Sequence, residues 1–348
     1  MDIKYLLAAS VKEHASDLHL SPNSCPIMRI NGELVRIEEA AVLNQDAIRD
    51  LIYSVMDKEQ QRVLETYLEL DFAITIPEVA SFRVNAFKQI NGLAAVFRVI
   101  PNQIPLLNTI VDKTDVFTKL LQLSSGLILV TGPTGCGKST TIAAMIDYIN
   151  TTQTSHIITI EDPIEFIHQS KKSLINQRQV HRDTVTFSAA LRSALREDPD
   201  VILVGELRDL ETIRLALTAA ETGHLVMATL HTSSAPRAVS RLIDVFPTGE
   251  KNIIRNLVSE SLQAVICQAL ISKVAGNRVA AFEIMLGIPA IRNLIREDKI
   301  AQMYTVMQTN YEKGMCTMKQ CLHELIEKGV INSSAAQESG FQRELFEN

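Results

Sequence analysis

Gly132-Pro-Thr-Gly-Cys-Gly-Lys-Ser139 is the stretch that decides the fold class of this chain. Two glycines separated by four residues and followed by lysine and a hydroxyl residue form the pattern of a phosphate-binding loop. In such a loop the backbone N–H groups point at phosphate oxygens, the lysine reaches the β- and γ-phosphates, and the hydroxyl binds Mg²⁺. The pattern therefore predicts that the chain binds a nucleoside triphosphate, with ATP and Mg²⁺ as the expected cofactors.

The residues on either side of the loop provide the context that the motif requires. Leu127–Val130 is a short apolar run that predicts a buried β-strand. Thr140–Ile149 has helical periodicity, and its apolar face carries Ile142, Met145, Ile146 and Ile149. The N-terminus of that helix adds a partial positive charge beside the loop. The residues expected to contact the nucleotide here are Gly132, Pro133, Thr134, Gly135, Cys136, Gly137, Lys138, Ser139 and Thr140.

Length and composition set broad limits. A chain of 348 residues, 46% of them hydrophobic, suggests two domains with cores of their own. The formal net charge of −6 argues against unspecific coating of nucleic acid, so we expect no nucleic-acid partner. Neither a membrane-spanning apolar run nor a secretory signal pattern is present. These features favour a cytoplasmic protein.

The cysteines do not form a recognisable framework. None belongs to a C-x-x-C pair, which argues against a zinc ribbon and a disulfide scaffold. We expect reduced thiols throughout, as in cytoplasmic proteins. The cysteines are Cys25, Cys136, Cys267, Cys316 and Cys321.

The chain divides near residues 101–118. The stretch Ile100–Pro105 contains two prolines and reads as a stiff linker. Residues 1–100 predict a small α+β domain, and residues 119–348 alternate helical and strand patterns, as a parallel sheet with helices on both faces requires. In the first domain, the expected strands are Ala15–Leu20, Ile27–Gly32 with an Asn-Gly turn signal, and Ser81–Ile100 around Asn91-Gly92, and the expected helix is Gln45–Leu68.

An acidic segment follows the strand after the phosphate loop. Ile157–Ile160 is apolar and leads directly into Glu161-Asp162-Pro-Ile-Glu165. Parallel strands deliver such carboxylates to the carboxyl edge of the sheet, where ligands bind. Glu161 and Asp162 are therefore candidates, with Ser139, to hold Mg²⁺ directly or through water. The alternative is a solvated acidic turn.

A second carboxylate follows the next strand. The helix Phe187–Arg196 ends before Pro199, and Val201–Val204 leads to Gly205-Glu206. Many phosphate-loop ATPases carry Asp where Gly205 stands, so the metal role shifts to Glu161 or Asp162. Glu206 becomes the candidate to orient and activate the attacking water, with Glu161 as a second catalytic candidate.

A histidine lies at each end of the expected strand Leu225–Leu230. His224 precedes this strand and His231 follows it. Imidazoles can hydrogen-bond a phosphate and change partners when it leaves. We expect His224 to contact the nucleotide and His231 to act in catalysis as a sensor of the nucleotide state; the alternative is a structural histidine at either position.

Together these motifs carry a resemblance that covers nearly the whole chain. The acidic box Ile160–Glu165, the Asp198–Asp209 segment and the His224–His231 box resemble the secretion ATPase superfamily. Three further segments resemble, more specifically, the type IV pilus retraction ATPases, which are PilT-like twitching motility proteins. These segments are Ala290–Glu297 (AIRNLIRE), Ala15–His19 (ASDLH) and Met307–Thr309 (MQT).

The resemblance implies a fold and an assembly. The implied fold class is α/β. A smaller N-terminal α+β, PAS-like domain comes first in the chain, and a RecA-like P-loop ATPase domain follows it. In that family the subunits form a hexameric ring, nucleotide is held between the two domains, and the N-terminal domain supplies arginines. Carried over by position, these are Arg83 in Phe82–Asn85 and Arg98 in Val96–Val99. Added positive charge of this kind assists γ-phosphate cleavage.

The segment Ala290–Glu297 has its own pattern. Pro289 suits the first turn of a helix, and an apolar stripe follows at Ile291, Leu294 and Ile295. We expect its polar side, with Arg292 and Arg296, to meet a partner or a moving domain and to couple hydrolysis to work. The alternative is an ordinary amphipathic helix packed on the core.

Departures from the family pattern are few. Cys136 replaces the usual Ser, and Gln177–His181 (QRQVH) departs from the usual QREVG. Asn310 stands where Gly is usual, and Asn tolerates a left-handed conformation. The four-cysteine zinc motif of many pilus extension and type II secretion ATPases is missing, which favours retraction over extension.

We therefore expect a homohexameric ATPase that powers type IV pilus retraction through an inner-membrane platform protein, bound peripherally at that membrane. An accessory retraction paralogue and a secretion or pilus assembly ATPase are the alternatives. A DNA-translocating ring ATPase shares the fold but would need a basic pore, which the net charge of −6 does not support. A regulatory subunit that binds but does not hydrolyse ATP would lack a water-activating carboxylate, which Glu206 provides.

Overall fold

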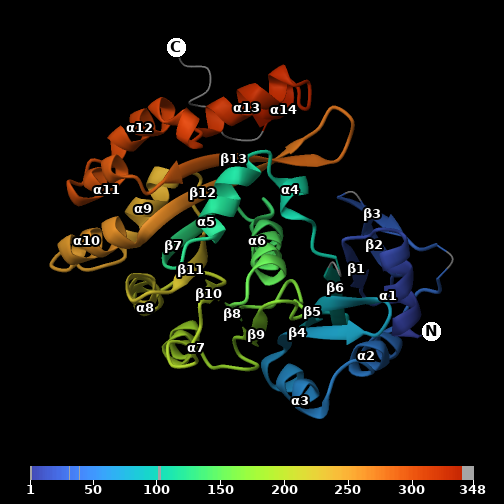
Figure 1. The fold of residues 1–348 in the computed structure, drawn as a ribbon. Coiled ribbons are helices and arrows are strands. Elements are labelled where there is room, and N and C mark those ends of the chain that lie inside the picture. Colours follow the sequence, from blue (N-terminus) through green and yellow to red (C-terminus); the bar gives the residue numbers. More distant parts are fainter. Residues whose placement is uncertain (1, 31, 39, 101–102, 339–348) are drawn as a thin grey trace. The chain divides into compact units, whose positions relative to one another are not determined.

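The chain forms two compact units, residues Met1–Gln103 and Ile104–Asn348. The structure is a computed structural model that describes residues 2–30, 32–38, 40–100 and 103–338 (Figure 1). Among the described residues, no helix has the length and apolar content needed to cross a lipid bilayer. Each unit has a hydrophobic core of its own.

The first unit is built on an antiparallel sheet with the strand order β3-β2-β1-β6-β5-β4. Its core buries side chains from the sheet and from the helices, among them Leu18, Ile48, Phe82 and Phe97. The strands are β1 (Asp17–Leu20), β2 (Ile27–Ile30), β3 (Glu33–Arg36), β4 (Glu69–Ile76), β5 (Ala80–Gln89) and β6 (Gly92–Ile100). The helices are α1 (Ile3–Lys12), α2 (Gln45–Tyr53) and α3 (Lys58–Tyr67).

The single helix expected over Gln45–Leu68 is wrong, because two helices occupy this stretch. Asp57 is the N-cap of the second of these helices, α3. Its side chain accepts a hydrogen bond from the backbone N–H of Gln60, and the Gln60 side chain accepts one from the backbone N–H of Asp57. This reciprocal capping box starts α3 as a separate helix.

The hairpin expected at Asn91-Gly92 is confirmed, since Gln89 pairs with Gly92 across a two-residue turn. In the first hairpin Ile30 pairs with Glu33; Asn31 lies outside the described residues.

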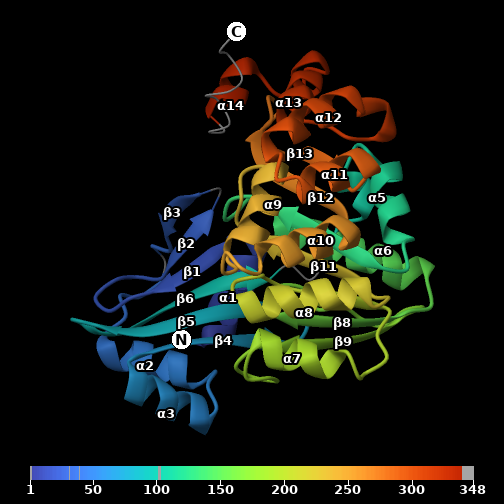
Figure 2. The ribbon, with the colours of Figure 1, turned by 90° about the vertical axis from the view of Figure 1, so that its left-hand side faces the viewer.

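The second unit is built on a mostly parallel sheet with the order β13-β12-β7-β11-β10-β8-β9 (Figures 1 and 2). Neighbouring strands run parallel from β12 to β9, and β13 pairs antiparallel with β12. The strands are β7 (Gly126–Thr131), β8 (His156–Glu161), β9 (Leu174–Gln179), β10 (Val201–Val204), β11 (Leu225–Leu230), β12 (Leu262–Ser272) and β13 (Arg278–Leu286). The prediction of an α/β chain with a smaller N-terminal α+β domain is confirmed.

Helices cover both faces of this sheet because its central strands are apolar on both sides. One face packs on α4 (Leu107–Ile110), α5 (Thr114–Leu121) and α6 (Lys138–Thr152). The other packs on α7 (Phe187–Ala194), α8 (Leu210–Glu221), α9 (Ala235–Asp244), α10 (Lys251–Ser261), α11 (Pro289–Arg296), η1 (Ile300–Gln302) and α12 (Met303–Thr309). The remaining elements are η2 (Tyr311–Lys313), α13 (Met318–Glu327) and α14 (Ser333–Glu338), and both α-helices pack on the ends of β12 and β13.

The linker that we expected, residues 101–118, includes residues that belong to the second unit. Pro101 and Asn102 lie outside the described residues, but α4 and the start of α5 fall within this range and belong to the second unit. Phe117 on α5 is fully buried and packs edge-on against Phe282 of β13. The apolar spacing of Phe117, Leu120 and Leu121, all buried, is the sequence signal for α5.

Helix α11 confirms the predicted stripe, because Ile291, Leu294 and Ile295 are all buried. On the polar side, which we expect to meet a partner or a moving domain, Arg292 makes hydrogen bonds within the chain. Its Nε donates to the carbonyl of Gly287 at 2.6 Å, and its other nitrogens donate to the carbonyl of Glu260 and the side chain of Gln263. Arg292 therefore holds the start of its own helix to the end of α10.

Candidate functional site

The phosphate-binding loop connects β7 to α6, as predicted, and its backbone requires glycine. Gly132 adopts φ +142°, and a Cβ there would lie 2.4 Å from the carbonyl oxygen of Gln268 on β12. Gly137 adopts φ +89°, a left-handed conformation that lets the backbone turn directly into α6. Cys136 is buried, and burial raises the pKa of its thiol, so it fills space as an inert side chain.

Lys138 lies within this loop as a buried cation. Its Nζ donates to the carbonyl oxygens of Gly132 at 2.8 Å and Pro133 at 3.0 Å, and the residue is 9% exposed. Within the part of the chain that the structure describes, Lys138 forms no ion pair shorter than 4.0 Å. A buried ammonium with neutral partners fits an anionic ligand, and the N-terminus of α6 adds to the same positive field.

Three of the predicted side chains follow neighbouring parallel strands. Glu161 ends β8, Glu206 comes shortly after β10, and His231 follows β11. Because these strands are parallel to β7, their carboxyl ends meet at the edge that carries the phosphate loop. At about 4.8 Å per strand, β10 lies about 10 Å from β7 and β8 about 14 Å from it. Of the two carboxylates, Glu206 thus follows the strand that lies nearer to β7.

Glu206 lies between two nitrogen-bearing side chains. Its Oε2 accepts a hydrogen bond from Arg208 Nε at 2.8 Å, and its Oε1 lies 3.4 Å from Nε2 of His231. Arg208 Nη1 also lies 3.9 Å from a carboxylate oxygen of Asp162. His231 therefore lies beside the Glu206 carboxylate, and its role as a sensor of the nucleotide state stays a prediction. Arg208 was missed from the sequence, although a cation two residues after Glu206 was the available signal.

Glu161 is half-buried at the end of β8. Its Oε1 accepts hydrogen bonds from Thr159 Oγ1 at 2.7 Å and from Gln177 Nε2 at 3.2 Å. Burial raises its pKa from 4.5 to about 7, against the opposing effect of these two donors. No group of three or more His, Cys, Asp or Glu side chains among the described residues could hold a metal ion by itself. Any Mg²⁺ here would rely on phosphate oxygens and water, as Mg²⁺ commonly does.

The glycine that replaces the usual Asp at position 205 has a packing reason. A Cβ there would lie 3.1 Å from the carbonyl oxygen of Ile160 and 3.2 Å from the Cα of Glu161. The Gly205 N–H also donates to that same carbonyl at 2.7 Å. The ends of β8 and β10 are therefore too close for a side chain without local movement.

The structure places His224 away from the phosphate loop of its own chain. His224 precedes β11, and its carbonyl accepts from the N–H of Gly126 at the start of β7. It therefore lies at the amino edge of the sheet, while the loop lies at the carboxyl edge. The six residues of β11 separate the two edges by about 20 Å. Nδ1 of His224 lies 3.0 Å from the carbonyl oxygen of Ala219, near the C-terminal end of α8. His224 therefore makes a hydrogen bond to the last turns of that helix.

The departures from the family pattern are accommodated locally. His181, where Gly is usual, adopts φ +66°, which lies in the left-handed region. Gln179 replaces the usual Glu; its side-chain oxygen accepts from the N–H of Ile164 at 3.4 Å, so it supports the acidic segment without an ion pair. Asn310 has φ −113°, so the left-handed tolerance that we expected is not used.

Arg83 and Arg98 belong to the first unit, where they are directly opposite each other on β5 and β6. Arg98 Nε donates to a buried carboxylate, that of Asp17, at 2.8 Å. Arg83 lies 3.8 Å from Asp71. Both side chains remain more than a third exposed, so both guanidinium groups are accessible at the surface of this unit.

The comparisons with known proteins agree with this geometry. Residues 1–337 match the family described as "Type II/IV secretion system protein". The chain belongs to this family.

Two curated members of the family are close in sequence. The "Type IV pilus retractation ATPase PilT" of Pseudomonas aeruginosa is 57% identical over 338 residues, covering 97% of this chain and 98% of that protein. The "Twitching motility protein" of Neisseria gonorrhoeae is 54% identical over 312 residues, covering 89% of this chain and 83% of that protein. A solved structure described as the pilus retraction motor PilT with bound ADP matches with a TM-score of 0.92 and 44% identity, covering 99% of this chain and 98% of that one.

The pKa of Glu161 predicts a pH-dependent stability. Because the folded carboxyl group has a pKa near 7 and its ordinary value is 4.5, the folded state binds more protons between these values. Stability should therefore fall as pH rises from about 4.5 to 7 and level off above that. Glu161→Gln keeps an oxygen for Thr159 and Gln177 but removes the titration. We expect this variant to exceed the wild type in free energy of unfolding by up to about 3 kcal/mol at pH 8.

Urea unfolding of both proteins without nucleotide and with a chelator, at pH 5 and at pH 8, measures this difference. The expected result is a gap at pH 8 that narrows at pH 5. An equal gap at both values would contradict a raised pKa at Glu161.

Proposed function

We propose that this chain is the ATPase that powers retraction of a type IV pilus, working as a hexamer at the cytoplasmic face of the inner membrane. The observation that carries the enzymatic part is the meeting of a phosphate-binding loop and Glu206 at one edge of a parallel sheet. The pilus part is supported by the similarity to a pilus retraction ATPase over 97% of this chain. An inner-membrane platform protein of the pilus is the proposed partner.

The loop would bind the triphosphate of ATP. We propose that the loop residues Gly132–Thr140 surround the phosphates, and that Lys138 exchanges its two carbonyl contacts for the β- and γ-phosphates. Charge-assisted hydrogen bonds to phosphate are stronger than the neutral contacts that Lys138 now makes. Ser139, in the first turn of α6, would hold Mg²⁺ directly, with Glu161 and Asp162 acting through water. When bound, Mg²⁺ neutralises charge on the β- and γ-phosphates.

Glu206 would orient and activate the attacking water. Its ion pair with Arg208 keeps the carboxylate in place, and His231 lies close enough to change partners as the phosphate leaves. Glu161, on the next strand outward, would assist the same water. We propose that Arg83 and Arg98 of a neighbouring subunit add positive charge in the transition state.

Glu206→Gln should separate nucleotide binding from turnover. The amide keeps the shape of the side chain but cannot accept a proton or hold water with a full charge, so turnover should fall by about a hundredfold or more. Affinity for Mg-ATP should stay at the wild-type value or rise. The matched control is Glu221→Gln, an exposed carboxylate at the end of α8, which should leave turnover unchanged.

Steady-state phosphate release and ATP binding measure both effects. The same variants, expressed in a strain that lacks its own retraction ATPase, test the pilus role. The wild type and Glu221→Gln should restore twitching, whereas Glu206→Gln should not. Normal turnover in Glu206→Gln would move the water-activating role to Glu161, and failure of the wild-type chain to restore twitching would contradict retraction.

Mixed assemblies test the proposed arginines. Arg83→Ala or Arg98→Ala should abolish hydrolysis while leaving nucleotide binding by an isolated subunit intact. Mixing either variant with Lys138→Ala should restore part of the activity, because one subunit keeps its loop and its neighbour keeps its arginines. Light scattering of the purified proteins should give the mass of six copies. A complete lack of rescue in mixtures shown to form mixed rings would exclude a shared site for these arginines.

A further inference from the structure

The amide of Gln268 on β12 contacts the phosphate loop from the side of the sheet. Its Nε2 donates to the carbonyl of Cys136 at 2.8 Å, and its Oε1 accepts from the Thr141 hydroxyl at 2.8 Å. Gln268 is 1% exposed and Thr141 is fully buried. These two hydrogen bonds connect β12 both to the loop and to the first turns of α6.

The bond to Cys136 also determines where the next N–H group points. The carbonyl of Cys136 and the N–H of Gly137 belong to one planar, trans peptide unit, so they point in opposite directions. Because Gln268 holds the carbonyl toward β12, the Gly137 N–H is directed away from the sheet. That is the side on which a phosphate loop presents its N–H groups to an anion.

The carbonyl of Cys136, which can only accept, determines which way the Gln268 amide faces, and the Thr141 hydroxyl holds the other end of that amide. The Thr141 hydroxyl donates to Oε1, and the N–H of Thr141 is already used by the carbonyl of Gly137 at 3.1 Å. A reversed amide would place Oε1 against the carbonyl oxygen of Cys136, where two acceptors would repel each other. Thr141, Gln268 and the loop therefore form one continuous chain of buried hydrogen bonds.

We propose that Gln268 is a positioning residue for nucleotide binding. It acts through the Cys136–Gly137 peptide, which it turns so that the Gly137 N–H faces the nucleotide phosphates. This inference rests on the proposed function, because it requires phosphates in the loop. The competing account is that Gln268 contributes only to the stability of the domain.

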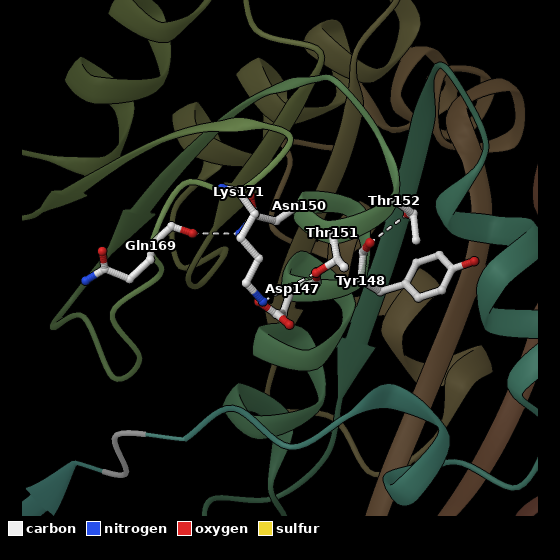
Figure 3. Close-up of polar contacts among 7 residues, drawn as sticks. All are labelled: Asp147, Tyr148, Asn150, Thr151, Thr152, Gln169 and Lys171. Atoms are coloured by element: carbon white, nitrogen blue, oxygen red, sulfur yellow. Dashed lines mark hydrogen bonds and ion pairs between the residues drawn. The ribbon is translucent and has the colours of Figure 1, made fainter.

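Asn150 provides a matched control at the other end of the same helix (Figure 3). It is fully buried; its Nδ2 donates to the carbonyl of Gln169 at 2.8 Å, and its Oδ1 accepts from the N–H of Lys171 at 2.9 Å. It is thus a buried amide that makes two hydrogen bonds, like Gln268. At 1.5 Å per residue, it lies about 18 Å along α6 from Lys138.

The test compares Gln268→Met with Asn150→Leu, since each removes two buried hydrogen bonds while keeping a similar number of side-chain heavy atoms. Calorimetric titration with Mg-ADP and with Mg-ATP measures affinity, and urea unfolding measures stability. Both variants should be less stable than the wild type. Only Gln268→Met should raise the Kd, by about tenfold or more, the effect of one lost hydrogen bond to a charged group.

Thr141→Val is the milder companion. It keeps the shape of the side chain and removes only the hydroxyl that holds the Oε1 end of the amide, so the Kd should rise less than in Gln268→Met. The two substitutions together should raise the Kd by less than the product of their separate effects, because both act through one chain of bonds.

The outcomes distinguish this inference from the proposed function. A wild-type chain that bound neither nucleotide would overturn both. A wild type that binds, with Gln268→Met matching Asn150→Leu in affinity, would overturn only the positioning role. If Gln268→Met does not fold, Thr141→Val decides the question, and an unchanged Kd in that variant would overturn the inference.

Discussion

Parallel pairing is the constraint on which the candidate site depends. Because β7, β8, β10 and β11 run in the same direction, the residues that follow them meet at one edge of the sheet. This brings Oε1 of Glu206 to 3.4 Å from Nε2 of His231, although the two residues are distant in the sequence. The same constraint places His224 away from that edge, because His224 precedes β11 and therefore lies at the opposite edge of the sheet. Position along a strand therefore decides which side chains lie at the edge that carries the phosphate loop.

Burial of ionisable side chains at the same edge of the sheet has an energetic cost. Lys138 is a buried cation whose hydrogen bonds go to neutral carbonyls, and Glu161 is a carboxyl group that burial makes hard to ionise. The raised pKa of Glu161 lowers the stability of the folded chain above about pH 4.5. Both side chains suit a site that receives phosphate and divalent cation. The closely packed strand ends at Gly205 and the loop glycine at Gly132 show that this geometry leaves little room for substitution. Proteins commonly trade stability for function at such sites.

Much of this was predictable from local patterns in the sequence. The loop motif, the apolar strands and the stripe of α11 each follow from spacing alone, and each is observed. The errors arose where a contact between distant residues decides the outcome. Local spacing does not show that Arg292 makes hydrogen bonds to the carbonyls of Gly287 and Glu260. Nor does it show that Gln268, in a strand, donates a hydrogen bond to the phosphate loop. Position along β11 separates His231 from His224, because His231 follows this strand and His224 precedes it.

The measurement that tests the central claim most directly is a crystal structure of the wild-type chain with Mg²⁺ and a non-hydrolysable ATP analogue. The distance to be measured is that from Lys138 Nζ to the nearest phosphate oxygen. Our account predicts that Nζ leaves the carbonyls of Gly132 and Pro133 and contacts a β- or γ-phosphate oxygen at about 2.8 Å. An analogue bound away from the loop, or bound there with Lys138 still on those carbonyls, would contradict it.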